Sequence, residues 1–290
     1  MKQLWPEKQR RLPKTGICHL IFRKKCIIML IRQDKGLKKG YNSITSLDDE
    51  SNITMMDFGI LVLDEGETYE DAEGKEKAYL LLKGGVVFEW DGERAEARRD
   101  SFFDENPVAL SVPSNTAVKV TSLSADTQIC ITRTYNDRQF SSRYYSKEDC
   151  RSEMRGRGTM GETSTRIVRT IFDYTNARES NLVLGEVITY PGKWSSYPPH
   201  HHPQPEIYYY RFLPEQGFGF AMLGDEVVKV HDHDTVVIDN VSHPQTAAPG
   251  YAMFYVWVIR HIDGNPYITP IFEAEHTWVT DKNARIWPDK

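Results

Sequence analysis

The arrangement of apolar residues into short runs constrains the fold of this chain more than any other feature. From about residue 55, short apolar runs alternate with Gly, Asp, Asn and Pro, and segments with helical periodicity are scarce. This pattern is typical of a β-sandwich or β-barrel and argues against strands that alternate with helices. The sequence therefore predicts an all-β protein.

The expected strands fall into two series with the same order of events. In each, an apolar strand ends in a glycine turn, and a later Asp-led strand ends at a proline or a polar turn. We interpret this as a duplicated β-barrel. The expected strands are 59–63, 78–82, 86–90, 108–112, 117–123 and 127–134, then 181–190, 207–212, 217–223, 226–230, 235–238 and 251–260.

A polar and basic stretch from about 137 to 164 separates the two series and contains Arg155-Gly156-Arg157-Gly158. We place the connection between domains there. The prediction is an N-terminal domain over 1–160 and a C-terminal domain over 161–290, which fits roughly 100 to 200 residues per domain.

Composition excludes several classes of partner. The net charge of −5 argues against a nucleic-acid-binding surface. The apolar run 26–31 is far shorter than the ~20 residues that cross a bilayer, and no secretory signal precedes it, so we expect no membrane partner and a cytoplasmic location.

The 4 cysteines (Cys18, Cys26, Cys130 and Cys150) form no C-x-x-C pair and are expected to be reduced, buried thiols.

Histidine is concentrated in the second half. Only His19 precedes residue 200, and the others are His200, His201, His202, His231, His233, His243, His261 and His276. If histidines carry the chemistry, the predicted site lies in the second half.

The segment from His200 to Glu206 has the pattern His-x-His-x-x-x-Glu. Alternate residues of a strand face the same side, so His200 and His202 point together and His201 points away. Prolines at 203 and 205 interrupt the strand, so that a short turn returns Glu206 beside the pair. His243, after the strand 235–238, is the candidate fourth ligand, with His233 as a minor alternative.

Three imidazoles and one carboxylate suit a divalent transition metal better than calcium or magnesium. We therefore expect one such ion per chain, zinc or manganese before iron, cobalt or nickel. The alternative is that these histidines lie in a polar loop and bind no metal.

The order His-x-His-x-x-x-Glu, strands, His resembles the two motifs of the cupin barrel. Residues 188–200 (Ile-Thr-Tyr-Pro-Gly-Lys-Trp-Ser-Ser-Tyr-Pro-Pro-His) resemble the signature of 5-deoxy-glucuronate isomerases. Residues within 208–212, 214–218, 243–251 and 275–278 also resemble those of this family at the corresponding positions. The resemblance therefore covers about 166–278, and it is weaker in the first half of the chain. The chain departs from the family pattern at two places. His233 stands where the family usually has glycine, and the segment 201–205 is shorter and richer in proline than the family's common acidic loop.

The resemblance implies a bicupin, with two double-stranded β-helix (jelly-roll) barrels in tandem and metal only in the C-terminal one. It also implies conversion of 5-deoxy-D-glucuronate, a small sugar acid, to 2-deoxy-5-keto-D-gluconate in myo-inositol breakdown. Because barrel edges often pair between subunits, a homo-oligomer is a further expectation.

Such an aldose–ketose isomerase must move a proton from C2 to C1 through a cis-enediolate, and a metal bound to the two oxygens stabilises the charge that develops. Glu206 is either a ligand or the proton carrier, and we favour ligand. Tyr208 and Tyr210 share its strand parity and either supply a hydroxyl to the cavity or are simply core. Arg211 and Arg260 are candidates for binding the substrate carboxylate. The alternative is that each is an ordinary surface arginine.

The sequence also leaves three rival functions open. They are the related 4-deoxy-5-keto-uronate isomerase of pectin breakdown, a metal-dependent cupin oxygenase with the same ligand set, and a metal-free sugar-binding cupin. The stretch 194–199 favours the inositol branch.

Overall fold

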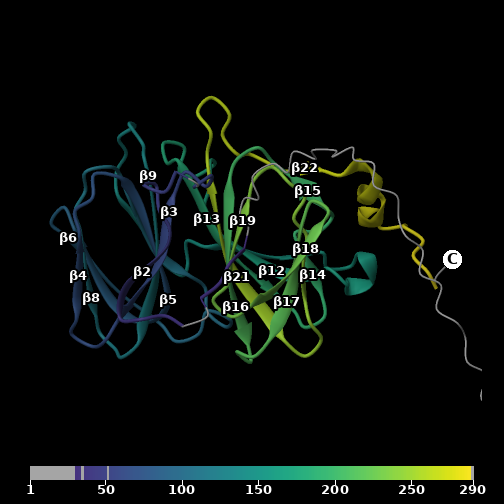
Figure 1. Cartoon of the computed structure of the whole chain (residues 1–290), viewed down its shortest axis with the longest axis horizontal. Helices are drawn as coiled ribbons and strands as arrows, with labels where there is room; N and C mark the ends of the chain where they lie inside the picture. The colour runs from purple at the N-terminus through teal and green to yellow at the C-terminus, as the bar shows by residue number, and fades with distance from the viewer. Residues whose placement is uncertain (1–29, 34–35, 51, 289–290) are drawn as a thin grey trace, which may run out of the picture.

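The computed structural model describes residues 30–33, 36–50 and 52–288 of the 290-residue chain. Figure 1 shows two groups of strands side by side, one formed by the first half of the chain and one by the second. Strands dominate the described residues, with two short 3-10 helices, η1 (Met160–Glu162) and η2 (Ala274–Thr280). The predicted all-β fold is confirmed. No helix in the described ranges is long and apolar enough to cross a membrane.

The first group is a nine-stranded antiparallel sheet with the order β10-β7-β5-β9-β3-β2, to which β4, β6 and β8 are attached. Its strands are β2 (Gly40–Thr45), β3 (Asp57–Leu63), β4 (Thr68–Asp71), β5 (Glu76–Trp90), β6 (Glu93–Arg99), β7 (Val108–Val112), β8 (Val118–Ser122), β9 (Thr127–Thr134) and β10 (Arg143–Tyr145).

Strand β5 joins two expected strands, 78–82 and 86–90, into one. Its first part pairs with β7 and β9, and its second part pairs with β6 and β8. Gly84 lies at the change of partner with φ +98°, and a Cβ there would come within 2.5 Å of Thr127 Oγ1. A glycine at this position therefore lets one strand bend between the two faces of the barrel.

The second group contains a seven-stranded sheet (β1-β19-β16-β21-β13-β12-β11), a four-stranded sheet (β14-β20-β17-β18) and the pair β15-β22. Its strands are β1 (Leu30–Ile31), β11 (Arg151–Arg155), β12 (Arg166–Phe172), β13 (Leu182–Thr189), β14 (Trp194–Ser195), β15 (His200–His201), β16 (Glu206–Leu213), β17 (Phe218–Leu223), β18 (Glu226–His231), β19 (Thr235–Ile238), β20 (Gln245–Ala247), β21 (Ala252–Arg260) and β22 (Ile271–Phe272).

The expected boundary at residue 160 stays a prediction, because the two groups are interwoven. Strand β1, from the start of the chain, pairs with β19 in the second group. The expected connection 137–164 contains β10, which belongs to the first group, and β11, which belongs to the second. The polar composition of this stretch hid both strands.

One of the three buried apolar clusters takes residues from both groups. Phe58, Leu80 and Cys130 of the first group pack in it with Tyr209 and Phe254 of the second. The other two clusters each lie within one group. The two barrels therefore share a core.

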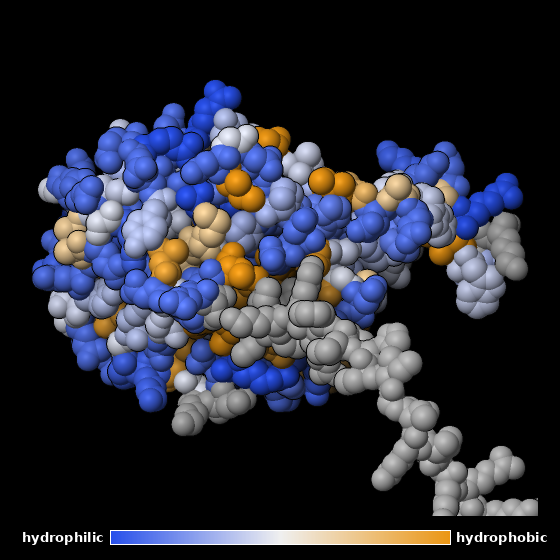
Figure 2. Space-filling view, turned by 45° about the horizontal axis from the view of Figure 1, so that its top comes forward, coloured by the Kyte–Doolittle hydropathy of each residue, from blue (hydrophilic) through white to orange (hydrophobic). Residues whose placement is uncertain are grey.

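The described cysteines match the expected burial only in part. Cys130 is buried and Cys150 is partly buried, and both are free thiols, whereas Cys18, Cys26 and His19 lie outside the described residues. Hydrophilic residues dominate the face in Figure 2, with smaller apolar patches between them. The homo-oligomer stays a prediction.

Candidate metal centre

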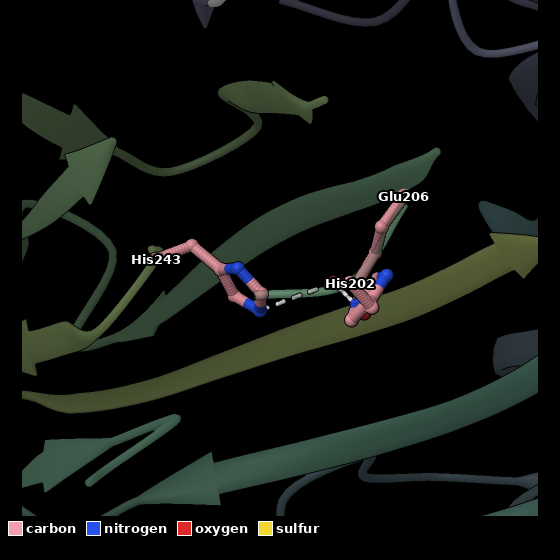
Figure 3. A group of neighbouring side chains, drawn as sticks. All are labelled: His202, Glu206 and His243. Carbon is pink, nitrogen blue, oxygen red and sulfur yellow. Dashed lines mark hydrogen bonds and ion pairs between the residues drawn. The ribbon is translucent and has the colours of Figure 1, made fainter. Parts of the chain in front are cut away.

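Three segments of the second barrel bring the predicted ligands together. Strand β15 carries His200 and leads directly to His202, and Glu206 begins β16, which lies between β19 and β21. His243 lies in the turn between β19 and β20. Figure 3 shows His202 and His243 converging on the carboxylate of Glu206.

The donor atoms of His202, Glu206 and His243 all lie within 4.8 Å of one another, and all three residues are buried. Glu206 Oε2 is 3.2 Å from His202 Nε2 and 3.3 Å from His243 Nε2. Two ligands on one metal ion, each about 2.0–2.2 Å from it, are separated by a similar distance of about 3 Å. The spacing fits a metal centre.

Each histidine is held in one orientation by its other ring nitrogen. Nδ1 of His202 bonds the carbonyl of Gln204 at 2.8 Å, and Nδ1 of His243 bonds that of Val241 at 2.8 Å. A carbonyl only accepts, so Nδ1 carries the proton and donates, which leaves the Nε2 lone pair for a metal. Nε2 of His243 is buried without a hydrogen-bond partner in the described structure, an orphaned atom that a metal would satisfy.

Electrostatics favours the metal-binding protonation states of the imidazoles. Burial lowers the pKa of His243 well below its usual value, and burial lowers the pKa of His200 to about 4. Both rings are therefore neutral near pH 7. Burial raises the pKa of Glu206, which its contact with His202 partly offsets. A bound cation would favour the charged carboxylate.

His200 lies beside this group and outside its set of mutually close donor atoms. Its ring is 4.8 Å from that of His243, and its Nδ1 donates to the carbonyl of Pro198 at 2.9 Å. His201 points away, towards Asn240 Oδ1 at 3.0 Å. His233, the minor alternative, contacts the Tyr209 hydroxyl and lies outside the pocket.

The two candidate tyrosines have different surroundings. Tyr208 lines the pocket, its ring 5.8 Å from that of His243 and its hydroxyl 2.9 Å from Ser196 Oγ. Tyr210 is buried deeper and donates to Gln245 Oε1 at 2.5 Å. Burial raises the pKa of Tyr208 well above its usual value, so its hydroxyl stays protonated and can donate a hydrogen bond.

The structure does not place Arg211 or Arg260 at the pocket. Arg211 bonds Asp232 and Gln128, and Arg260 bonds Thr134 and the carbonyl of Tyr135. On β16 and β21, these arginines have the opposite parity to the pocket residues and face the first barrel. Their predicted substrate contact has no support in this geometry.

Sequence reasoning missed several residues that line the pocket. Alternation along β21 could have indicated some of them, because Tyr255, Trp257 and Ile259 are alternate residues of that strand and line the pocket. The missed residues are Arg155, Arg166, Val168, Val187, Ser196, Tyr255, Trp257, Ile259 and Tyr267.

Comparison with known proteins places this chain in a family. Residues 29–279 match the KduI/IolB family. A 5-deoxy-glucuronate isomerase of Halalkalibacterium halodurans is 26% identical over 254 residues, which is 80% of this chain and 91% of that protein. One from Geobacillus thermodenitrificans is 29% identical over 245 residues, covering 77% and 86% of the two chains.

Solved structures support the bicupin fold. An IolB-like protein from Salmonella typhimurium LT2 has a TM-score of 0.75 at 22% identity, over 84% of this chain and 96% of that one. An oxalate decarboxylase from Lactobacillus farciminis has a TM-score of 0.58 at 10% identity, over 82% and 85%. The predicted resemblance and the predicted bicupin fold are both confirmed.

Proposed function

The chain belongs to the KduI/IolB family, and we propose that it is a metal-dependent aldose–ketose isomerase that converts 5-deoxy-D-glucuronate to 2-deoxy-5-keto-D-gluconate. The observation that carries the metal dependence is the buried group His202, Glu206 and His243, in which Nε2 of His243 has no hydrogen-bond partner among the described residues. In this proposal His200 is the fourth ligand, and the ion is zinc or manganese.

The reaction is balanced within the substrate. A hydrogen moves from C2 to C1 and a proton moves from the C2 hydroxyl to the C1 oxygen, so no oxidant or water is consumed. The bound metal would supply positive charge to the two oxygens between which electron density shifts. The protein residues hold the ion, exclude water and orient the substrate.

Tyr208 is the protein group best placed to assist proton movement at the oxygens. Its protonated hydroxyl lines the pocket and is held by Ser196. Glu206, as a ligand, would be a poor base. The hydroxyl of Tyr210 already donates a hydrogen bond to Gln245, so this residue stabilises the core behind the site.

A second substrate is favoured by one observation. The matching family includes KduI in its description, and the 4-deoxy-5-keto-uronate isomerase of pectin breakdown is the related activity. The curated relatives reported above are 5-deoxy-glucuronate isomerases, which supports that substrate as the first choice.

The test measures bound metal and ketose formation from 5-deoxy-D-glucuronate, for the wild type, His243→Ala and His201→Ala. We expect about one metal ion per chain and turnover in the wild type and in His201→Ala, because His201 points away from the group. His243→Ala should lose both. Turnover that survives His243→Ala, or a wild type without metal, would overturn the proposal. Oxygen consumption would identify the oxygenase, and turnover of only the pectin-derived uronate would identify the second substrate.

A further inference from the structure

Arg166, at the start of β12, differs from the other buried arginines. Among the described residues, five other arginines are buried, and each has a carboxylate within 4.0 Å. The pairs are Arg99 with Glu186, Arg133 with Asp71, Arg169 with Glu186, Arg211 with Asp232 and Arg260 with Asp263. Arg166 is 7% exposed and forms no ion pair in the described part of the chain.

The guanidinium of Arg166 is anchored on one side only. Nη1 donates to the carbonyl and to the hydroxyl of Ser164, both at 2.8 Å, and Nη2 donates to the carbonyl of Tyr197 at 3.2 Å. A guanidinium has five N–H groups, so two of them, on Nε and Nη2, have no partner in the described structure. These two nitrogens share one edge, the fork that binds a carboxylate through two parallel hydrogen bonds.

Arg166 also lines the pocket that holds the metal group and Tyr208. Burial lowers the pKa of Arg166, and the hydroxyls of Tyr208 and Tyr255 and the more distant carboxylate of Glu153 offset this only in part. Glu153 forms its ion pair with Arg155 and not with Arg166. A buried charge without a partner is unfavourable, and an anion that enters the pocket would compensate for it.

We propose that Arg166 binds the carboxylate of the substrate and selects a sugar acid over the corresponding neutral sugar. This inference rests on the proposed function, because it names the anchor for the acid group of that substrate. Arg155, at the same pocket, is less suited, since its Nη2 already pairs with Glu153 at 2.6 Å and its side chain is 52% exposed.

The test compares the binding of D-glucuronate and of its neutral amide, D-glucuronamide, by isothermal titration calorimetry on the metal-loaded full chain. We expect the wild type to bind the acid about 10- to 100-fold more tightly than the amide, as a charge-assisted bidentate contact implies. Arg166→Gln should abolish this preference and leave amide affinity within about twofold, because only the charged contact is removed. Arg166→Lys should keep part of the preference.

Arg151→Gln is the matched control. Arg151 lies on the neighbouring strand β11, is 50% exposed and pairs with Asp173 outside the pocket, so this variant should keep the full preference. Metal content and thermal unfolding check that Arg166→Gln folds, because Arg166 also supports Ser164 and Tyr197.

Three outcomes would overturn the inference: no preference for the acid in the wild type, a preference that survives Arg166→Gln, or an equal loss of affinity for both ligands. The last would mean that Arg166 only supports the local backbone. The proposed reaction fails separately, if 5-deoxy-D-glucuronate is not isomerised although the Arg166-dependent preference is present.

Discussion

At the scale of single residues, hydrogen bonds on the far side of each ring determine what a histidine can do. His202 and His243 donate from Nδ1 to backbone carbonyls and so present Nε2 to the pocket. His233 instead uses Nδ1 on the hydroxyl of Tyr209 and has Nε2 at 3.2 Å from Asp232. Residue type alone did not distinguish these environments.

His233 predicts a loss of stability in acid. Burial lowers its pKa from about 6.5 in the unfolded chain to about 4 in the fold. Above pH 6.5 both states are neutral at this residue. As the pH falls from 6.5 towards 4, only the unfolded chain takes up the proton, so the free energy of unfolding decreases. At pH 5 this amounts to at most about 2 kcal/mol.

The measurement is urea unfolding of the wild type and His233→Gln between pH 8 and pH 5. The variant should lose less stability over this range than the wild type. The comparison at pH 8, where neither side chain is charged, isolates the cost of the altered contact with Tyr209. Equal losses in the two proteins would show that His233 does not titrate in this way.

At the scale of elements, the sequence was informative where strands are long and apolar. The ranges 108–112 and 127–134 match β7 and β9, and 235–238 matches β19. The two-residue strands β14 and β22 were not expected, because their pairing partners and not their composition create them. Strand β15 was expected as the extended segment of the two histidines, but its partner β22 was not. For the same reason, the sequence could place His200 and His202 on one face without showing that His200 lies beside the close group of His202, Glu206 and His243 and not within it.

Remote pairing also explains why the sequence could not show the surroundings of Arg211 and Arg260. A single sequence shows that Arg211 alternates with Tyr210, but it does not show that a second barrel covers the outer face of β16. The partners Asp232 and Gln128 come from the turn between β18 and β19 of the second barrel and from β9 of the first. Arg166 was overlooked because β12 begins at the end of a polar stretch.

The short strand β1 predicts a measurable role for Arg32. Its Nη1 pairs with Asp234 Oδ2 at 2.9 Å, and the Asp234 side chain is only 4% exposed. Arg32→Gln leaves that carboxylate without its counter-charge, so we expect a loss of about 1–2 kcal/mol in the free energy of unfolding. Hydrogen exchange should accelerate in β19, which pairs with β1.

Urea unfolding and hydrogen exchange with mass spectrometry measure the two effects. Arg98→Gln is the control, because Arg98 pairs with Asp100 at 3.0 Å on the surface and such pairs contribute little. An Arg32→Gln variant as stable as Arg98→Gln would mean that β1 does not support the sheet.

At the scale of the whole molecule, the first barrel supports the second from behind. Residues of β16 alternate between the metal pocket and the shared core, as Tyr208 and Tyr209 illustrate. The wall of the pocket is therefore also the wall between the barrels. This gives the first barrel a structural role even if it binds no metal.

Glu186 of β13 tests this coupling. Its carboxylate accepts from Arg99 of β6 at 2.6 and 2.8 Å and lies 3.5 Å from Arg169, and the three side chains are almost fully buried. Glu186→Gln removes the only negative charge between two buried guanidinium groups in this described cluster. We expect a loss of about 3–5 kcal/mol in the free energy of unfolding.

Because the ion pair joins the barrels, hydrogen exchange in Glu186→Gln should accelerate together in β5 of the first barrel and β16 of the second. Calorimetry should show one transition, shifted to lower temperature. Glu215→Gln is the control, since Glu215 is 82% exposed and should change stability by no more than about 0.5 kcal/mol. Faster exchange confined to one barrel, or a second calorimetric transition, would mean that the barrels unfold independently and that the first does not support the metal pocket.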